Sequence, residues 1–121
     1  MIEIIKNLPE HVIGFRATGK VDKEDYEKIL IPIVDNEAKK FGQLNFLLVL
    51  DTDVSNYSIG AWIDDALIGV KHLTQWHKIA IVSSQKAVVT LTDTLGHLIP
   101  GKSKGFLLTD LEDAIKWVSE K

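Results

Sequence analysis

Two short, unbroken apolar runs constrain the fold of this chain more than any other feature of its sequence. Residues 45–50 read NFLLVL and residues 78–82 read KIAIV, so after its first residue neither run alternates between apolar and polar side chains. Successive side chains of a strand point to opposite faces of the sheet, and a strand without alternation must be covered on both. Such strands are typical of a layered α/β protein in which helices pack on a mostly parallel sheet.

The segments around these runs supply the other strands and the helices. Apolar periodicity and turn residues predict further strands over 2–6, 11–18 and 104–108, and helices over 22–42, 59–73, 85–99 and 109–118. The short turn at 7–10 favours an antiparallel hairpin between the first two strands. We therefore predict one α/β domain over residues 1–121, with a five-stranded, mostly parallel sheet, an antiparallel N-terminal edge and about four helices.

Two helix signals in this pattern can be checked individually. Pro32 lies inside the first helical pattern, where it removes a backbone hydrogen bond and should bend the helix near Lys28. Thr109 and Glu112 have the spacing of a capping box, in which each side chain bonds the other residue's backbone N–H, and should open the last helix.

Composition excludes several classes of function. The chain has no cysteine, which excludes a thiolate nucleophile, a disulfide framework and a Cys-ligated zinc site. Its formal net charge is −3 and Arg16 is its single arginine, so we expect no nucleic-acid partner. The sequence shows no apolar run of about 18 residues and no secretory signal pattern. We therefore expect no transmembrane segment and a cytoplasmic protein.

No residue pattern predicts catalysis, a metal or a cofactor. Neither the H-E-x-x-H motif of zinc proteases nor the G-x-S-x-G elbow of hydrolases occurs. The run 96–103 matches the P-loop pattern, but a helix is expected before it and a strand after it, which is the reverse of a P-loop. Asp64 and Asp65 are adjacent on a helix, diverge by about 100° and are expected on its solvated face. We expect a protein that is not an enzyme.

The helix predicted over 59–73 is the most unusual element. One stripe along it is apolar, made of Ile59, Trp62, Ile63, Ala66, Leu67, Val70 and Leu73, and Ala61 and Ile68 add apolar surface elsewhere. A helix that is apolar over so much of its circumference has more apolar surface than packing on a sheet alone would bury. It can line a ligand cavity, form a dimer interface, touch a membrane surface, or lie fully in the core, and the pattern leaves these alternatives open.

Several segments resemble one bacterial family. They are the run 19–26 (GKVDKEDY), the strand 46–50, the segment 71–73 before the strand 78–82, the turn 98–101 and the run 110–118 (DLEDAIKWV). Together they resemble the SpoIIAA-like proteins, relatives of the STAS domain. The resemblance implies a β-α superhelix that is also similar in fold to the lipid-carrying CRAL-TRIO domains.

The STAS relatives also suggest a regulatory site. Anti-sigma antagonists carry a phosphorylated serine where a helix begins after the third strand, and the corresponding stretch here contains Ser55 and Ser58. A phosphate is favoured at a helix N-terminus, but the antagonists' Asp-Ser-Ser/Thr-Gly run is missing, and Ser58 also suits a plain N-cap.

From these observations we expect a non-enzymatic binding module. The helix over 59–73 is expected to bind an apolar small molecule or lipid, or a protein partner such as a second copy of the chain. The alternative is a STAS-type module switched by phosphorylation of Ser58 or Ser55.

Overall fold

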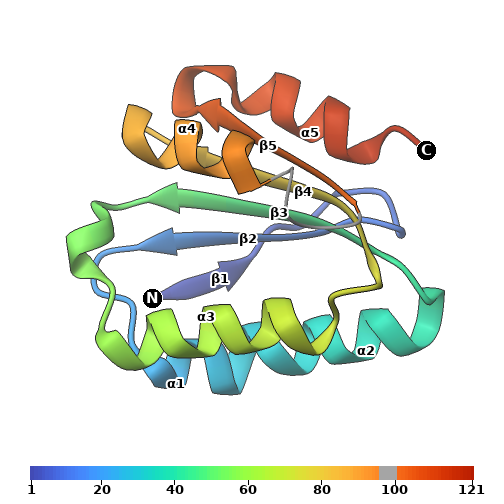
Figure 1. Cartoon of the computed structure of the whole chain (residues 1–121), viewed down its shortest axis with the longest axis horizontal. Helices are drawn as coiled ribbons and strands as arrows, with labels where there is room; N and C mark the ends of the chain where they lie inside the picture. The colour runs from blue at the N-terminus through green and yellow to red at the C-terminus, as the bar shows by residue number, and fades with distance from the viewer. Residues whose placement is uncertain (96–100) are drawn as a thin grey trace.

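Five strands lie side by side in chain order in the computed structural model, which describes residues 1–95 and 101–121. They are β1 (Ile2–Ile4), β2 (Ile13–Thr18), β3 (Leu44–Asp51), β4 (Trp76–Ser83) and β5 (Lys102–Leu107). β1 pairs antiparallel with β2, and every later pair is parallel (Figure 1). The predicted α/β sheet with an antiparallel N-terminal edge is confirmed.

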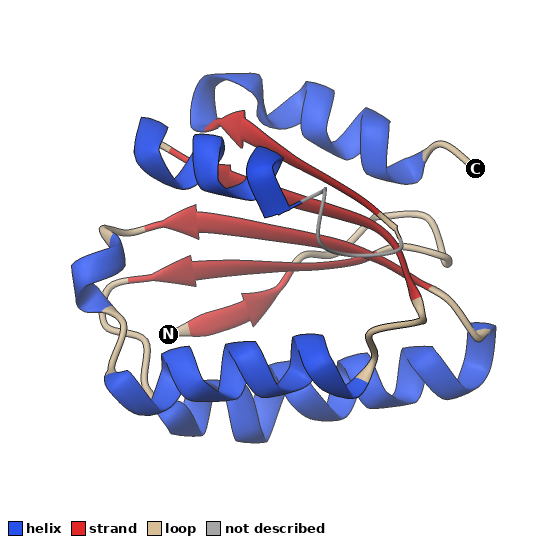
Figure 2. Cartoon of the chain, viewed as in Figure 1, coloured by secondary structure: helices blue, strands red, loops and turns tan. Residues whose placement is uncertain are grey.

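Helices cover both faces of this sheet (Figure 2). The α-helices are α1 (Lys23–Asp25), α2 (Ile31–Phe41), α3 (Ile59–Lys71), α4 (Lys86–Leu95) and α5 (Leu111–Ser119), and 3₁₀ turns occupy Val54–Asn56 and Leu108–Asp110. Crossovers between parallel strands share one hand, so a sequential strand order places the helices of successive crossovers on the same face. Accordingly α2, α3 and α4 share one face, and α5, which follows the last strand, covers the other.

The central strand shows why the apolar runs do not alternate. Phe46, Leu48 and Leu50 of β3 pack towards α2 and α3, whereas Leu47 and Val49 pack towards α5. All five side chains are buried, as covering on both faces requires.

The last helix is tied to the sheet by a buried lysine. Lys78 of β4 donates to the carbonyl oxygens of Trp117 (2.8 Å) and Glu120 (2.9 Å) at the end of α5. Its ammonium group also lies 5.1 Å from the centre of the Trp117 ring. A cation is favoured at a helix C-terminus, where carbonyl groups lack partners within the helix.

The first helical region contains the irregularity expected near Lys28. A π-helical segment, Tyr26–Leu30, joins α1 to α2, and the Ile31 N–H bonds to the Tyr26 carbonyl five residues earlier. Pro32, which cannot donate a backbone bond, falls at the start of α2. The perturbation therefore takes the form of a wide helical turn. Gly42 ends α2 with a left-handed φ of 73°.

Of two expectations about helix ends, one is wrong and the other falls partly outside the described residues. Thr109 falls inside the 3₁₀ turn Leu108–Asp110, so α5 begins at Leu111 without the expected capping box of Thr109 and Glu112. α4 is described to Leu95, and the rest of the helix predicted to residue 99 lies outside the described residues, as does most of the P-loop-like run.

None of the helices within residues 1–95 and 101–121 is long and apolar enough to cross a membrane.

Candidate functional site

Helix α3 turns its apolar stripe to solvent. The exposed fraction is 79% for Ile59, 45% for Trp62, 54% for Ile63, 60% for Leu67, 71% for Val70 and 43% for Leu73. Ala66, in the middle of the stripe, is exposed as well. The structure therefore brings all the candidate residues of this helix together on one face, and that face is uncovered.

The opposite side of α3 contacts the protein and carries the acids. Ala61, Asp64 and Ile68 are buried, with Asp64 only 7% exposed. The expectation that Asp64 and Asp65 lie on the solvated face is wrong. Ala61 and Ile68, which are three to four residues from these acids, form the side of the helix that packs into the core.

Tyr26 provides a hydrogen-bond donor for the inward-facing carboxyl group of Asp65. The buried Tyr26 hydroxyl donates to Asp65 Oδ1 at 2.8 Å and is hydrogen-bonded to the Tyr57 hydroxyl at 3.3 Å. Burial raises the pKa of the Asp65 carboxyl, and the hydrogen bond from Tyr26 opposes this rise only in part. Burial likewise raises the pKa of both tyrosines above the ordinary phenol value.

Asp64 has no such compensation. Its Oδ2 atom is buried and makes no hydrogen bond within the described residues. An unpaired buried polar atom costs free energy. The inward side of α3 thus carries both acids beside Ala61 and Ile68, while its outward side is apolar, whereas an ordinary surface helix turns its acids to solvent.

The stripe is held in place at both ends of the helix. Near its start, the Trp62 ring packs on the Tyr57 ring with 4.7 Å between ring centres, and Tyr57 is buried. Near its end, the Trp76 indole donates to the Gly69 carbonyl at 3.0 Å. Lys71 pairs with Asp35 at 3.0 Å. The exposed apolar face is therefore preformed on a fixed helix.

The two serines before α3 have different environments. Ser58 is the N-cap, and its hydroxyl oxygen accepts the Ala61 N–H at 3.1 Å, so the cap interpretation is confirmed. Ser55 lies exposed in the 3₁₀ turn Val54–Asn56, where its backbone N–H donates to Asp53 Oδ1 at 2.9 Å. Ser55 is therefore not at the start of α3.

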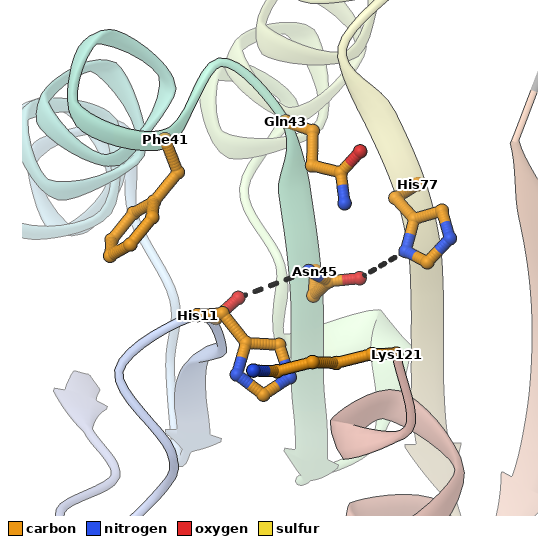
Figure 3. A pocket seen from close by; sticks show the side chains of 6 residues that line it. All are labelled: His11, Phe41, Gln43, Asn45, His77 and Lys121. Atoms are coloured by element: carbon orange, nitrogen blue, oxygen red, sulfur yellow. Dashed lines mark hydrogen bonds between the residues drawn. The ribbon is translucent and has the colours of Figure 1, made fainter.

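Two hollows among the described residues are lined by none of the stripe residues. The larger, of about 320 Å³, lies at the amino ends of β3 and β4 and is lined by His11, Phe41, Gln43, Asn45, His77 and Lys121 (Figure 3). The buried Asn45 amide donates to the His11 carbonyl at 3.1 Å and its oxygen accepts from His77 Nδ1 at 2.7 Å. The buried polar atoms of Asn45 are thus paired within the protein.

The smaller hollow, of about 290 Å³, lies near the end of α3 and is lined by Asp35, Ala38, Lys39, Lys71, His72 and Gln75. His72 bonds Asp35 at 2.8 Å and Gln75 at 2.7 Å, so its ring is also occupied by the protein itself. Among the described residues, no group of three or more histidine or acidic side chains is placed to hold a metal.

Comparison with known proteins places the chain in a family. The sequence model described as SpoIIAA-like matches residues 12–119. The chain belongs to the SpoIIAA-like family. Its structure is similar to the crystal structure of an uncharacterized protein of the DUF3478 family, with a SpoIIAA-like fold, from Shewanella loihica PV-4. The two share 26% sequence identity and a TM-score of 0.68, over 98% of this chain and 92% of that one. No curated protein matches the chain.

The SpoIIAA-like fold explains where the sequence-predicted residues lie but not what they bind. The apolar periodicity found the α3 stripe, and the serine pattern found the Ser58 cap. The sequence analysis missed the Tyr26–Tyr57–Asp65 group, because its members lie 31 and 39 residues apart along the chain. It also missed Asn45, whose place at the start of an apolar run was the available signal.

Proposed function

We propose that this SpoIIAA-like chain is a cytoplasmic, non-catalytic binding module whose helix α3 docks on an apolar surface of a protein partner. One observation carries the proposal: α3 and the turn after it present seven apolar side chains outward, while the two acids of α3 turn inward. Exposed apolar patches of several hundred Å² on a soluble domain mark interaction sites.

The shape of the site favours a protein over a small apolar ligand. A small molecule is held in a concave pocket that buries most of its surface. The stripe runs along the outside of a helix, and none of its residues lines either of the two hollows described above. A second apolar surface is the natural complement of a convex helix face.

The charges around α3 give little support to a membrane surface. Interfacial helices carry Lys and Arg on the polar face to attract anionic lipid. Here Lys71 is paired with Asp35, and Lys23, which lies beside Gly60 at the start of α3, is 3.5 Å from Glu27. The formal net charge of −3 would also oppose approach to an anionic bilayer.

The alternative is a module switched by phosphorylation of Ser58 or Ser55. At Ser58 the hydroxyl oxygen is already the acceptor for the first turn of α3. At Ser55 the neighbouring Asp53 would repel a phosphate. No observation on either serine favours this function over docking through α3.

Site-specific photocrosslinking in cells of the source organism tests the proposal. A p-benzoylphenylalanine residue would replace Leu67 on the stripe, and Glu112, exposed on α5 across the sheet, would be the matched control position. Illumination should give a discrete adduct of protein size at position 67 and none at position 112. Equal adducts at both positions, no adduct at either, or an adduct of lipid mass at position 67 would overturn the proposal.

A further inference from the structure

We infer that the protein partner of α3 is a second copy of this chain, bound by antiparallel packing of the two α3 helices across a twofold axis. The inference rests on the proposed function, since it names the occupant of the same face. It is drawn from the spacing, symmetry, area and charge of that face.

The spacing of the exposed residues is that of a helix that packs on another helix. Ile59, Ile63, Ala66 and Val70 of α3, and Leu73 in the turn just after it, follow one another at intervals of four, three, four and three residues. This alternation is the a/d pattern of paired helices, in which side chains of one helix fill spaces on the other. We call this row of five residues the seam. Trp62 and Leu67 lie on either side of the seam and widen the exposed apolar face.

The face is complementary to itself when two copies run antiparallel. A twofold axis beside Ala66 places Ile63 opposite the partner's Val70, and Ile59 opposite the partner's Leu73. The smallest side chain of the seam then lies at the axis, where the two helices approach most closely. In a twofold interface each contact occurs twice, so one favourable pairing is doubled.

The area is sufficient for an interface of ordinary size. The exposed fractions of the stripe residues correspond to roughly 600–700 Å² of apolar surface per chain, against about 800 Å² per partner in a standard interface. Neighbouring side chains on the flanks would be covered in addition. Trp62 is half exposed and packs on Tyr57. It is the kind of aromatic residue that carries much of the binding free energy in such interfaces.

The charges neither oppose self-association nor select another partner. Within α3, every residue of which is described, the exposed stripe carries no charged side chain. Two identical copies therefore meet without like-charge repulsion. A different protein would ordinarily be chosen by complementary charges, and this face offers none.

Sedimentation velocity of the purified chain tests the inference. Between about 1 µM and about 200 µM, the mass should rise from 13.5 kDa towards twice that value. Leu67→Glu should stay monomeric throughout. Leu91→Glu is the matched control, because Leu91 on α4 is equally exposed at 60%, and it should behave as the unmodified chain.

A single introduced cysteine tests the orientation, because the chain has none of its own. Ala66→Cys, beside the axis, should form a disulfide-linked dimer under mild oxidation. Ile59→Cys should not, because in an antiparallel pair the two residues 59 lie about 20 Å apart along the helix axis. Equal linkage at both positions would overturn the antiparallel arrangement.

The results separate this inference from the proposed function. A chain that stays at 13.5 kDa at all concentrations, or a Leu67→Glu variant that still dimerises, would overturn the second copy as partner. If position 67 then crosslinks to a different protein in cells, the docking function stands and this inference fails. Far-ultraviolet circular dichroism and urea unfolding of Leu67→Glu verify that it is folded.

Discussion

Two neighbouring residues of α3, Leu67 and Ile68, provide the sharpest test of which side of this helix faces the protein. Leu67 is 60% exposed and Ile68 is 6% exposed, although both are aliphatic, equal in size and adjacent in sequence. Replacing each by alanine removes a similar number of carbon atoms from the same helix. Helix propensity therefore changes little between the two variants, and the difference in stability reports burial.

The expected magnitudes differ by several fold. Ile68 packs in the core that also contains Ala61 and Trp76, so Ile68→Ala should lower the free energy of unfolding by about 2–5 kcal/mol through lost burial and a residual cavity. Leu67 keeps most of its surface in water in a single chain. Leu67→Ala should therefore cost less than about 1 kcal/mol, as expected for a surface position.

Urea unfolding followed by circular dichroism measures both values. The protein concentration should be about 1 µM, at the low end of the range in which weak dimers form, so that the monomer is observed. With a slope of about 2 kcal/mol per molar urea, the midpoint should fall by about 1–2.5 M for Ile68→Ala and by less than about 0.5 M for Leu67→Ala.

Equal losses in the two variants would refute the orientation of α3. A larger loss for Leu67→Ala would mean that the stripe is the core-facing side, and the proposed docking function would fail with it. A larger loss for Leu67→Ala only at high protein concentration would instead be the signature of the dimer, because assembly adds to stability by mass action.

Two further predictions concern the groups beneath and before α3. Burial raises the folded-state pKa of Asp65 above its unfolded value of 3.8, so the folded chain binds more protons and its stability should fall as pH rises through the window above 3.8. Asp65→Asn keeps an oxygen that accepts the Tyr26 hydrogen bond and should remove this fall in stability. In thermal unfolding at pH 7 the variant should be more stable than the unmodified chain. A lower stability at pH 7 would contradict the burial argument. Ser58→Ala should cost about 1 kcal/mol through loss of the N-cap, while Ser58→Asp should unfold near the unmodified chain, since aspartate also caps; equal losses in both variants would exclude the capping role.

The sheet could be predicted from the sequence because its signals are local. The runs that contain Leu47, Val49 and Ala80 lack polar alternation, and only a strand covered on both faces accommodates that pattern. Turn residues and helix caps, such as Gly42 and Ser58, then fix the order of strands and helices. Sequential pairing follows from that order when each crossover is short.

The orientation of α3 could not be predicted in the same way. Apolar periodicity shows that Ile59, Ile63 and Val70 share a face, but it does not say whether that face meets the sheet or the solvent. The answer depends on Tyr26, which comes from a distant part of the chain and accommodates Asp65 by donating to it. Without that partner in view, the acids are naturally assigned to the solvated side.

The sequential strand order has a consequence for how the chain is made on the ribosome. Each new strand pairs with the strand synthesised just before it, so no strand has to insert between two older ones. The face formed by Leu47, Val49 and Val82, however, is covered largely by α5, which follows all five strands in the sequence. A nascent chain therefore carries all five strands with much of one apolar face uncovered until α5 emerges, and until then Lys78 lacks the carbonyl groups of Trp117 and Glu120 to which it donates.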